Sequence, residues 1–218
     1  MRRVFAAAPR IVALLVLAFA LQQPAAAQTR GTGDSSELTE ATTLCNKGDA
    51  KACNVVGGMY ATGLHGVKLD AGKATEYFLK SCNGNHPIGC ANLANQYYNG
   101  LGVTMDRTKA VQTYQRSCDL GAVTGCVDLG VIYRDGKGDQ REDRPRAARL
   151  LQRACDLSDS ACASIASMYE LGWGVPKDPN VARTLYERSC YAKRSDAAED
   201  IQKIWSTASC NVLARMKK

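Results

Sequence analysis

Cysteines recur along this 218-residue chain with a period close to 36 residues, and this spacing constrains the fold more than any other feature. Eight of the ten cysteines form four close pairs: Cys45/Cys53, Cys82/Cys90, Cys118/Cys126 and Cys155/Cys162. The first members of these pairs, followed by Cys190, step by 37, 36, 37 and 35 residues, and the second members step by 37, 36 and 36. A fixed period of this length predicts a repeat architecture.

Three other residue types keep the same register. A tyrosine stands seven residues after each second cysteine, an aspartate stands twelve residues before each next first cysteine, and an alanine follows each aspartate by four residues. They are Tyr60, Tyr97, Tyr133 and Tyr169; Asp70, Asp106, Asp143 and Asp178; and Ala74, Ala110, Ala147 and Ala182. The repeat therefore governs the whole unit as well as its cysteines.

Each unit is predicted to be a pair of antiparallel helices, A and B, with helix A beginning near the second cysteine. In the second unit Cys90, Leu93, Ala94 and Tyr97 form the i, i+3, i+4, i+7 stripe of a buried helix face. A glycine-rich segment, residues 99–103 in that unit, ends helix A. Helix B then begins at the aspartate, whose carboxylate can accept hydrogen bonds from the free N–H groups of the first turn.

These units predict an all-α solenoid of about four helix-hairpin repeats, at roughly 49–82, 86–118, 122–155 and 158–190. Ser35 to Cys45 is predicted to be a half-unit B helix, and Asp196 to about Thr207 a half-unit A helix, with Ile201 and Trp205 in the Leu and Tyr positions. Such half-units cover the apolar ends of a stacked array.

The first 27 residues have the pattern of an export signal. Arginines precede an eleven-residue apolar run, Ile11 to Leu21, which is too short to span a bilayer, and Ala25 and Ala27 fit a small-x-small cleavage site. A mitochondrial presequence is the alternative, but it would be an amphipathic helix with spread arginines. We therefore predict a signal peptide at 1–27, a flexible linker at 28–34, a solenoid at 35–207 and a basic tail at 208–218, in a periplasmic or secreted protein without a membrane span in its mature chain.

Cleavage would remove three arginines and leave 25 basic against 21 acidic side chains, a net charge of +4 that is evenly scattered. This balance does not favour a nucleic-acid partner. Export also places the cysteines in an oxidising compartment, where an even number of them predicts disulfides. The paired cysteines are seven or eight residues apart and form no C-x2-4-C knuckle, so we predict disulfides that join each helix B to the next helix A, and no metal or cofactor.

Cys190 and Cys210 are left over. Ala198 occupies the place of a fifth second cysteine, and a helix running to Thr207 would put Cys210 about 15–18 Å from that place. Disulfide bonding needs Cα atoms within about 7 Å. Either the helix breaks early and the tail folds back, or the two thiols stay free or bridge to another chain; the spacing favours the second outcome.

The segment YYNGLGVTMDRTKAVQTYQRSCDLGAVTGC, residues 97–126, resembles the consensus of Sel1-like repeats, which are related to tetratricopeptide repeats. The eight-residue cysteine step resembles the secreted, cysteine-rich Hcp branch, and the likeness covers about residues 35–207. It implies a right-handed solenoid whose A helices line a concave face, and an adaptor for protein or peptide ligands. Some cysteine-rich members bind penicillins and are weak β-lactamases. Asp139 departs from the pattern by replacing the usual valine of the G-x-G-V turn.

Residue patterns for catalysis are scarce. The chain has no S-x-x-K and no G-x-S-x-G segment, and its two histidines, His65 and His86, are predicted to be surface loop residues. We predict no catalytic residue; if the protein is an enzyme, the resemblance implies a β-lactamase-type hydrolase. Five arginines cluster around the third helix B and are expected to form a solvated face, with attraction of an anionic partner as the alternative. They are Arg141, Arg144, Arg146, Arg149 and Arg153.

The polar face of helix A is the better functional candidate. Positions two, five and nine after the second cysteine lie opposite the Cys/Leu/Tyr stripe and hold Asn92, Asn95, Asn99, Asp128, Asp135, Ser164 and Ser167. Asparagine both donates and accepts hydrogen bonds, so a ladder of it can hold the backbone of an extended peptide. A merely hydrated surface is the alternative.

Three functions remain open at this point. The favoured one is a non-catalytic scaffold that binds a protein or extended peptide, such as a cell-wall peptide. The second is a penicillin-binding protein with slow β-lactam hydrolysis, and the third is an assembly factor in the mitochondrial intermembrane space.

Overall fold

The computed structural model describes residues 34–64, 66–137, 140–192 and 199–216, with the side chains of 34, 35 and 199–207 excepted. The predicted signal peptide, most of the linker, His65, Asp139, Ala198 and the side chains of Ile201 and Trp205 lie outside the described part. Within it, the chain is all-α, with ten α-helices and one short 3-10 helix. No helix of this part is both long and apolar enough to cross a membrane.

Helices alternate in role along the chain. The A helices are α2 (Ala50–Thr62), α4 (Pro87–Asn99), α6 (Val123–Asp135) and α8 (Cys162–Leu171). The B helices are α1 (Asp34–Asn46), α3 (Ala71–Asn83), α5 (Arg107–Asp119), α7 (Arg144–Leu157) and α9 (Pro179–Tyr191). A 3-10 turn, η1 (Asp159–Ala161), precedes α8, and α10 (Glu199–Met216) ends the described part.

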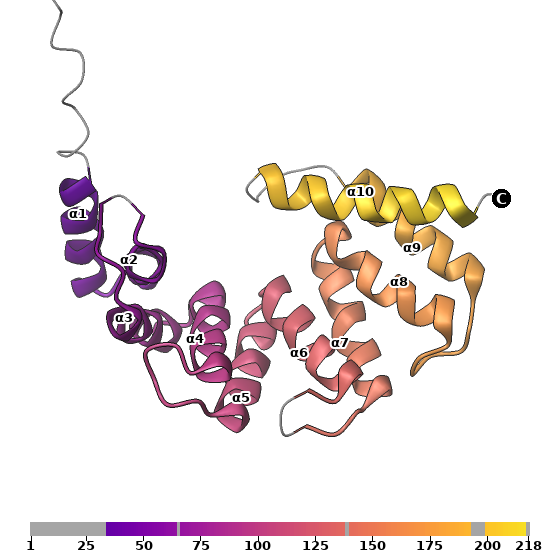
Figure 1. Cartoon of the computed structure of the whole chain (residues 1–218), viewed down its shortest axis with the longest axis horizontal. Helices are drawn as coiled ribbons and strands as arrows, with labels where there is room; N and C mark the ends of the chain where they lie inside the picture. Colours follow the sequence, from indigo (N-terminus) through magenta and orange to yellow (C-terminus); the bar gives the residue numbers. More distant parts are fainter. Residues whose placement is uncertain (1–33, 65, 138–139, 193–198, 217–218) are drawn as a thin grey trace, which may run out of the picture.

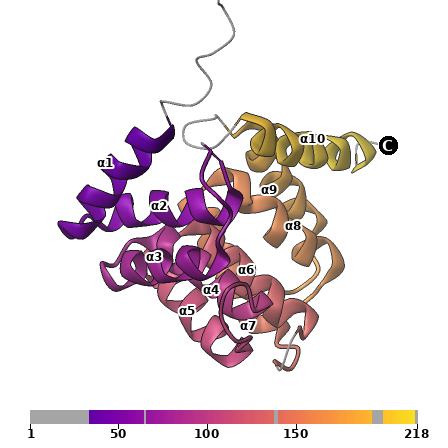
Figure 2. The same cartoon turned by 60° about the vertical axis from the view of Figure 1, so that its left-hand side comes forward.

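The helices are arranged in chain order along an arc from α1 to α10 (Figure 1). Each helix packs on its neighbours in sequence, and α4 also contacts α2 and α6, so these consecutive A helices touch one another directly. The A helices therefore lie on the inside of the curve, and we call their solvent-facing surface the inner face. Turned by 60°, the same hairpins stack behind α1 and α2 (Figure 2). This confirms the predicted solenoid of helix hairpins.

The turn from A to B has the same construction in every unit. A glycine with φ between 60° and 72° ends each A helix, at Gly63, Gly100, Gly136 and Gly172. The backbone N–H of the repeat aspartate donates to the carbonyl of the repeat tyrosine at 2.8–2.9 Å in all four units. The aspartate side chains then accept backbone N–H groups of the first turn of helix B, as predicted.

A second glycine in the turn brings neighbouring units together. Gly102 has a φ of +69°, and a Cβ there would overlap the backbone carbonyl of Ala71, at the start of the preceding B helix. Gly174 makes the same approach, because its Cβ would overlap the backbone of Arg144. The G-x-G segments thus combine a left-handed helix end with a close contact between repeats.

Packing inside the hairpins alternates between two solutions. In the first and third units the A helix has a glycine, Gly57 or Gly130, against which Phe78 or Leu151 of helix B packs. In the second and fourth units this A position is alanine, and helix B places a tyrosine, Tyr114 or Tyr186, with its hydroxyl at the inner face. The four repeat alanines of helix B are fully buried, which explains why no larger residue stands there.

Disulfides join the end of each B helix to the following A helix, as predicted. The four expected bonds are all present, with Cα–Cα distances of 4.3–4.6 Å. They are Cys45–Cys53, Cys82–Cys90, Cys118–Cys126 and Cys155–Cys162. Each bond thus fixes one hairpin to the next.

The surroundings of Cys53 add two details to the sequence prediction. Helix α2 begins at Ala50, three residues before Cys53 and close to the predicted start of the first unit. Cys45, Ala52 and Cys53 also form a small apolar cluster of their own, with Tyr77 packed against it, apart from the main core that begins at Ala74. The half-unit α1 therefore closes its end of the array through this separate cluster and its disulfide.

Buried serines support three of the junctions. The serine before the B cysteine donates to a backbone carbonyl at or just before the start of the preceding A helix: Ser81 to Ala50, Ser117 to Pro87 and Ser189 to Ser160. Gly89 and Gly125 leave the space that Ser81 and Ser117 occupy. A glycine on one side of the disulfide and a serine on the other are therefore a matched pair.

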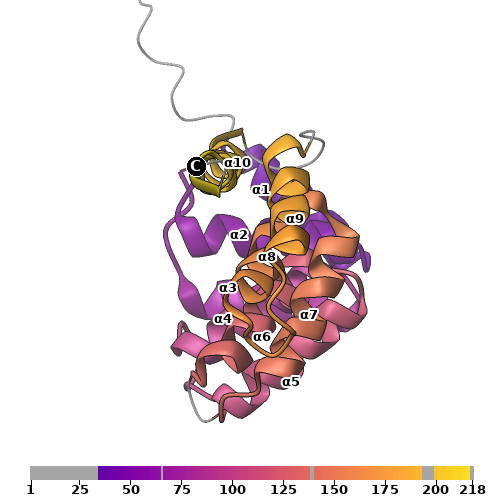
Figure 3. The ribbon, with the colours of Figure 1, turned by 90° about the vertical axis from the view of Figure 1, so that its right-hand side faces the viewer.

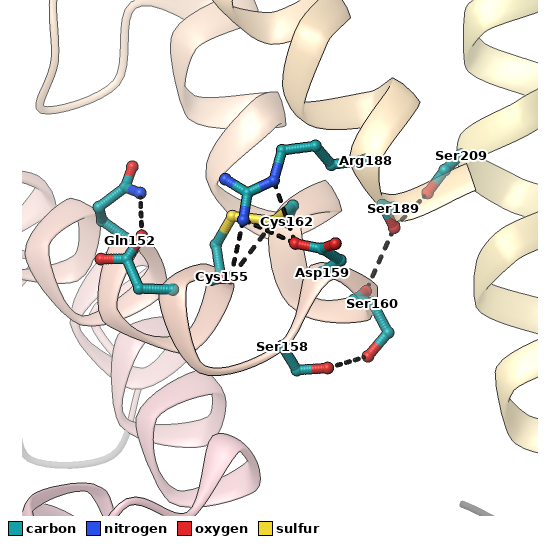
Figure 4. The surroundings of a disulfide bond; sticks show 10 residues. Gln152, Cys155, Ser158, Asp159, Ser160, Cys162, Arg188, Ser189 and Ser209 are labelled. Atoms are coloured by element: carbon teal, nitrogen blue, oxygen red, sulfur yellow. Dashed lines mark hydrogen bonds and ion pairs between the residues drawn. A yellow bond between two sulfur atoms is a disulfide. The ribbon is translucent and has the colours of Figure 1, made fainter. Parts of the chain in front are cut away.

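The junction of α7 with α8 is built differently. Its cysteines are seven residues apart, alanine replaces serine at Ala154, and η1 precedes α8. Arg188 of α9 ties this junction together by an ion pair with Asp159 at 2.6 Å and a contact with the carbonyl of Cys155 (Figure 4).

The prediction for Cys190 and Cys210 is wrong, because these residues form a fifth disulfide with a Cα–Cα distance of 5.0 Å. The terminal helix does not end at Thr207; α10 continues unbroken to Met216, through the predicted basic tail. Its later half packs on α9, with Ser209 bonded to Ser189 and the carbonyl of Met216 to Arg183. Viewed from the end of the array, α10 lies next to α9 (Figure 3).

Candidate functional site on the inner face

The seven predicted site residues lie on the A helices α4, α6 and α8. The structure connects some of them to partners on other helices and turns others back onto their own helix. Only the donors and acceptors that have no partner within the protein are available to a ligand.

Asn92 links two neighbouring repeats. Its amide nitrogen donates to Oδ1 of Asn54 on α2 at 2.9 Å, and both side chains are half-buried. Asn54 stands one residue after its cysteine, whereas Asn92 stands two residues after its own, so the sequence pattern did not select Asn54. The Asn92 amide oxygen remains as an acceptor on the inner face.

Asn95 is held by a helix B tyrosine. The hydroxyl of Tyr114, buried on α5, donates to Oδ1 of Asn95 at 2.7 Å. This bond orients the Asn95 amide so that its nitrogen faces outward with two N–H donors. The fourth unit repeats the arrangement with Tyr186 donating to Glu170 on α8 at 2.9 Å. Tyr114, Tyr186 and Glu170 were not predicted; their sequence signal is a tyrosine four residues after the repeat alanine.

Three of the predicted residues are bonded locally. The Asn99 side chain donates to the carbonyl of Asn95, and Ser167 donates to the carbonyl of Ser164. Asp135 forms ion pairs with Arg134 at 2.6 Å and Lys137 at 3.0 Å, and its hydrogen bond to Arg134 lowers its pKa to about 2. Asp135 therefore brings little uncompensated charge to the inner face.

Asp128 has a different environment. It is half-buried on α6, and within the described part of the chain its carboxylate has no hydrogen bond or ion pair. Burial raises its pKa to about 6. Burial, followed by the nearby charge of Asp128, also raises the pKa of the Tyr114 phenol, which places the two groups close together.

Two hollows lie at the A–B turns of the second and third units. They have volumes of about 450 and 610 Å³ and are lined around Tyr97 with Asp106, and around Tyr133 with Asp143. Lys109 lies 4.4 Å from the ring centroid of Tyr97 and Arg146 4.1 Å from that of Tyr133, so these cations already stack on the tyrosines.

His86 lies directly before α4 and caps this helix. Its Nδ1 accepts the N–H of Gly89 at the start of α4, and burial lowers its pKa. No group of three or more His, Cys, Asp or Glu side chains in the described part is arranged to hold a metal ion.

The arginine cluster around α7 is mostly bonded within the protein. Arg144 lies 4.5 Å from the Trp173 ring and pairs with Glu142, Arg146 stacks on Tyr133, and Arg153 pairs with Asp119. Arg144 and Arg153 thus link the third repeat to its neighbours, and Arg146 holds the two helices of its own repeat together.

Comparison with known proteins places these features in context. A curated relative, cytochrome c oxidase assembly factor 7A from Xenopus laevis, is 36% identical over 150 residues, or 66% of this chain. The match spans only 49% of that relative, so the chain corresponds to about half of its length.

Three solved structures are similar to this chain. A Sel1 repeat protein from Oxalobacter formigenes is 27% identical, with a TM-score of 0.60 over 70% of this chain and 68% of that one. A protective antigen of uropathogenic Escherichia coli that displays an SLR fold is 25% identical, with a TM-score of 0.69 over 82% of this chain and 36% of that chain. Cysteine-rich protein B (HcpB) of Helicobacter pylori is 28% identical, with a TM-score of 0.48 over 67% of this chain and 97% of that one.

The family model of the Sel1 repeat matches four successive segments, 50–86, 87–121, 123–159 and 160–193. These segments coincide with the four helix hairpins of the structure and cover well over half of the sequence. The chain therefore belongs to the Sel1 repeat family.

Proposed function

We propose that the protein is an exported binding scaffold that holds a protein or extended peptide along its inner face. The observation that carries this proposal is that residues of other helices fix the orientation of the Asn92 and Asn95 side chains. Asn54 fixes one amide so that an oxygen remains as acceptor, and Tyr114 fixes the other so that N–H donors remain. Donors and acceptors at the centre of the face suit the alternating groups of an extended backbone.

Rigidity supports the same proposal. Association costs conformational freedom, and a surface whose side chains are already held in place loses less on binding. Here five disulfides hold the helix junctions, and the Tyr114 and Asn54 bonds hold the polar groups.

The disulfides also support export to an oxidising compartment. The exported form would start after Ala27, so N-terminal sequencing of the native protein should begin at Gln28. Retention of Met1 in a cytosolic protein would contradict this proposal.

The binding function is tested by replacing Asn95 with alanine. The oxidised wild-type chain, Asn95→Ala and the outer-surface control Gln112→Ala on α5 would each be used to capture partners from a periplasmic extract, with captured proteins quantified by mass spectrometry. A partner held through the inner face should be lost from Asn95→Ala and kept by Gln112→Ala. Because a buried polar contact left unmade costs about 1–3 kcal/mol, affinity for it should fall roughly 5- to 150-fold. Equal capture by all three proteins would reject the inner face.

A role as an assembly factor is a second candidate, because the curated relative carries that description for cytochrome c oxidase. An assembly factor is itself a binding scaffold, so this candidate concerns the partner and compartment. A mature N-terminus produced by mitochondrial import would favour it over bacterial-type export.

Hydrolysis of β-lactams has no comparable support. The chain lacks S-x-x-K, and His86 uses its Nδ1 to cap α4. A chromogenic β-lactam should therefore be hydrolysed no faster than in a denatured control, and sustained turnover by the folded protein would revive this alternative.

A further inference from the structure

The hydrogen bond between Asn54 and Asn92 forms a rung from α2 to α4, and the next pair of A helices, α4 and α6, has no equivalent rung. Asn54 stands one residue after Cys53, and Asn92 stands two residues after Cys90. The same register pairs Asp128 of α6 with Ala91 of α4. Ala91 is only 2% exposed and ends in a methyl group, so it cannot donate a hydrogen bond to the carboxylate.

Other neighbours do not replace the missing donor. The charge of Asp128 raises the pKa of Tyr114, but the hydroxyl of Tyr114 donates its hydrogen to Asn95 instead. The other two carboxylates of the inner face are satisfied, Asp135 by Arg134 and Lys137, and Glu170 by Tyr186. Asp128 is therefore the inner-face carboxylate that the described residues leave without a partner.

A half-buried carboxylate without a counter-charge is costly, because burial disfavours its ionised form. Asp128 nevertheless titrates at a pKa of about 6, so it is mostly ionised at neutral pH. The titratable group that interacts with its charge is the phenol of Tyr114 on α5, which supplies no positive charge. Tyr98 of α4 also raises the pKa of Tyr114, and the guanidinium of Arg107 lies over the Tyr98 ring at 5.8 Å from the centroid.

We propose that Asp128 is the subsite for a basic side chain, lysine or arginine, of the peptide bound along the inner face. This inference rests on the proposed function and adds the chemistry of one ligand position. The cation would pair with the carboxylate one repeat along from the rung that Asn54 and Asn92 form.

Peptide selection tests the subsite while the natural partner is still unidentified. A phage library of random 12-residue peptides would be selected in parallel on the oxidised wild-type chain, on Asp128→Asn, and on Asp119→Asn. The last is a matched control that removes an exposed carboxylate from α5. Wild-type and Asp119→Asn selections should enrich peptides with Lys or Arg at one fixed position, whereas Asp128→Asn should lose that preference.

A synthetic peptide from the selection gives the quantitative test. Replacing its conserved basic residue with norleucine should weaken binding to wild type about tenfold or more, and should change binding to Asp128→Asn by less than twofold. The difference in peptide affinity between wild type and Asp128→Asn should also shrink as the pH falls below about 6, because Asp128 becomes protonated.

Protein folding is checked by thermal unfolding at two pH values. The pKa of Asp128 is raised above 3.8, so the folded state holds its proton more tightly, and its unfavourable effect grows as the pH rises from about 4 to 6. Asp128→Asn should therefore melt at a higher temperature than wild type at pH 7 and at about the same temperature at pH 4.

Failure of the subsite and failure of the binding function would give different results. Peptides enriched on wild type without a basic preference, or with the same preference on Asp128→Asn, would overturn this subsite and leave the binding function standing. No enrichment over reduced, unfolded protein would reject the binding function and the subsite together.

Discussion

The first three disulfide junctions and the last two hold successive helices together in different ways. Between α1 and α6 every disulfide closes an eight-residue step, whereas the later steps are seven and twenty residues. The Cα–Cα distances nevertheless stay between 4.3 and 5.0 Å. The comparison shows that the bond between helices is kept through the array, while the length of chain between the two cysteines is not.

The residues just after the second cysteine are also alike in both regions. Cys90 precedes Leu93 and Ala94 at the same spacing as Cys210 precedes Leu213 and Ala214. Leu93 and Leu213 are both buried, at 3% and 6% exposure. The end of α10 thus takes the place of an A helix, and the residues from Glu199 to Ser209 are an addition at its N-terminal side.

The contact made by the second turn glycine should be the most sensitive one in both regions. Gly102→Ala and Gly174→Ala each force a Cβ into a neighbouring backbone at positive φ, so each should lower the free energy of unfolding by about 3 kcal/mol or more. Gly121→Ala is the control, because it has a positive φ but open space, and should cost about 1 kcal/mol. Denaturant unfolding measures all three. Tolerance of Gly174→Ala alone would mean that the later repeats are loosely packed.

Loss of a disulfide should separate the regions by where the protein loosens. Replacing Cys118 and Cys126 with serine should lower the free energy of unfolding by about 2.6 kcal/mol, and replacing Cys190 and Cys210 by about 3.3 kcal/mol if unfolding is cooperative, because the larger loop gains more chain entropy. Hydrogen exchange should then show opening of α5 and α6 in the first variant, and of α10 alone in the second. Faster exchange throughout the array in the second variant would contradict a local role for the terminal bond.

The serine–glycine junction gives the smallest effect and the sharpest comparison. Ser117→Ala leaves the Pro87 carbonyl without its donor, and Gly125→Ala forces a Cβ against the Ser117 hydroxyl. Each single change should cost about 1–2 kcal/mol, but the double variant resembles the natural Ala154/Ala161 junction and should cost less than the sum by about 1 kcal/mol. Additive free energies from chemical unfolding would show that the two junction types are unrelated.

Most of the fold could be predicted because it depends on short-range rules. The cysteine period, the capping aspartates and the terminal glycines act within a few residues of one another, so spacing alone indicates four hairpins and four disulfides. The fifth bond could not be predicted by spacing, because the insertion before Cys210 hides it. The C-x-x-L-A pattern at Cys210 would have revealed it, since Cys90 shows the same pattern inside an A helix.

The candidate site was only partly predictable, for a different reason. Periodicity selects the face of a helix but not which side chains of other helices reach it. Asn54 and Tyr114 meet Asn92 and Asn95 through packing between helices, and the absence of a donor opposite Asp128 depends on the alanine that stands in another repeat. Such contacts appear only when the repeats are placed together.

The constancy of the disulfide across steps of seven, eight and twenty residues has a practical consequence for engineering. Each junction loop can be exchanged or lengthened while the covalent bond still sets where the next A helix begins. Foreign segments grafted between a B cysteine and its A partner should be displayed along one edge of the solenoid at intervals of one repeat. The natural addition before Cys210 is an example of such a graft, carried by the molecule without loss of the helix packing beyond it.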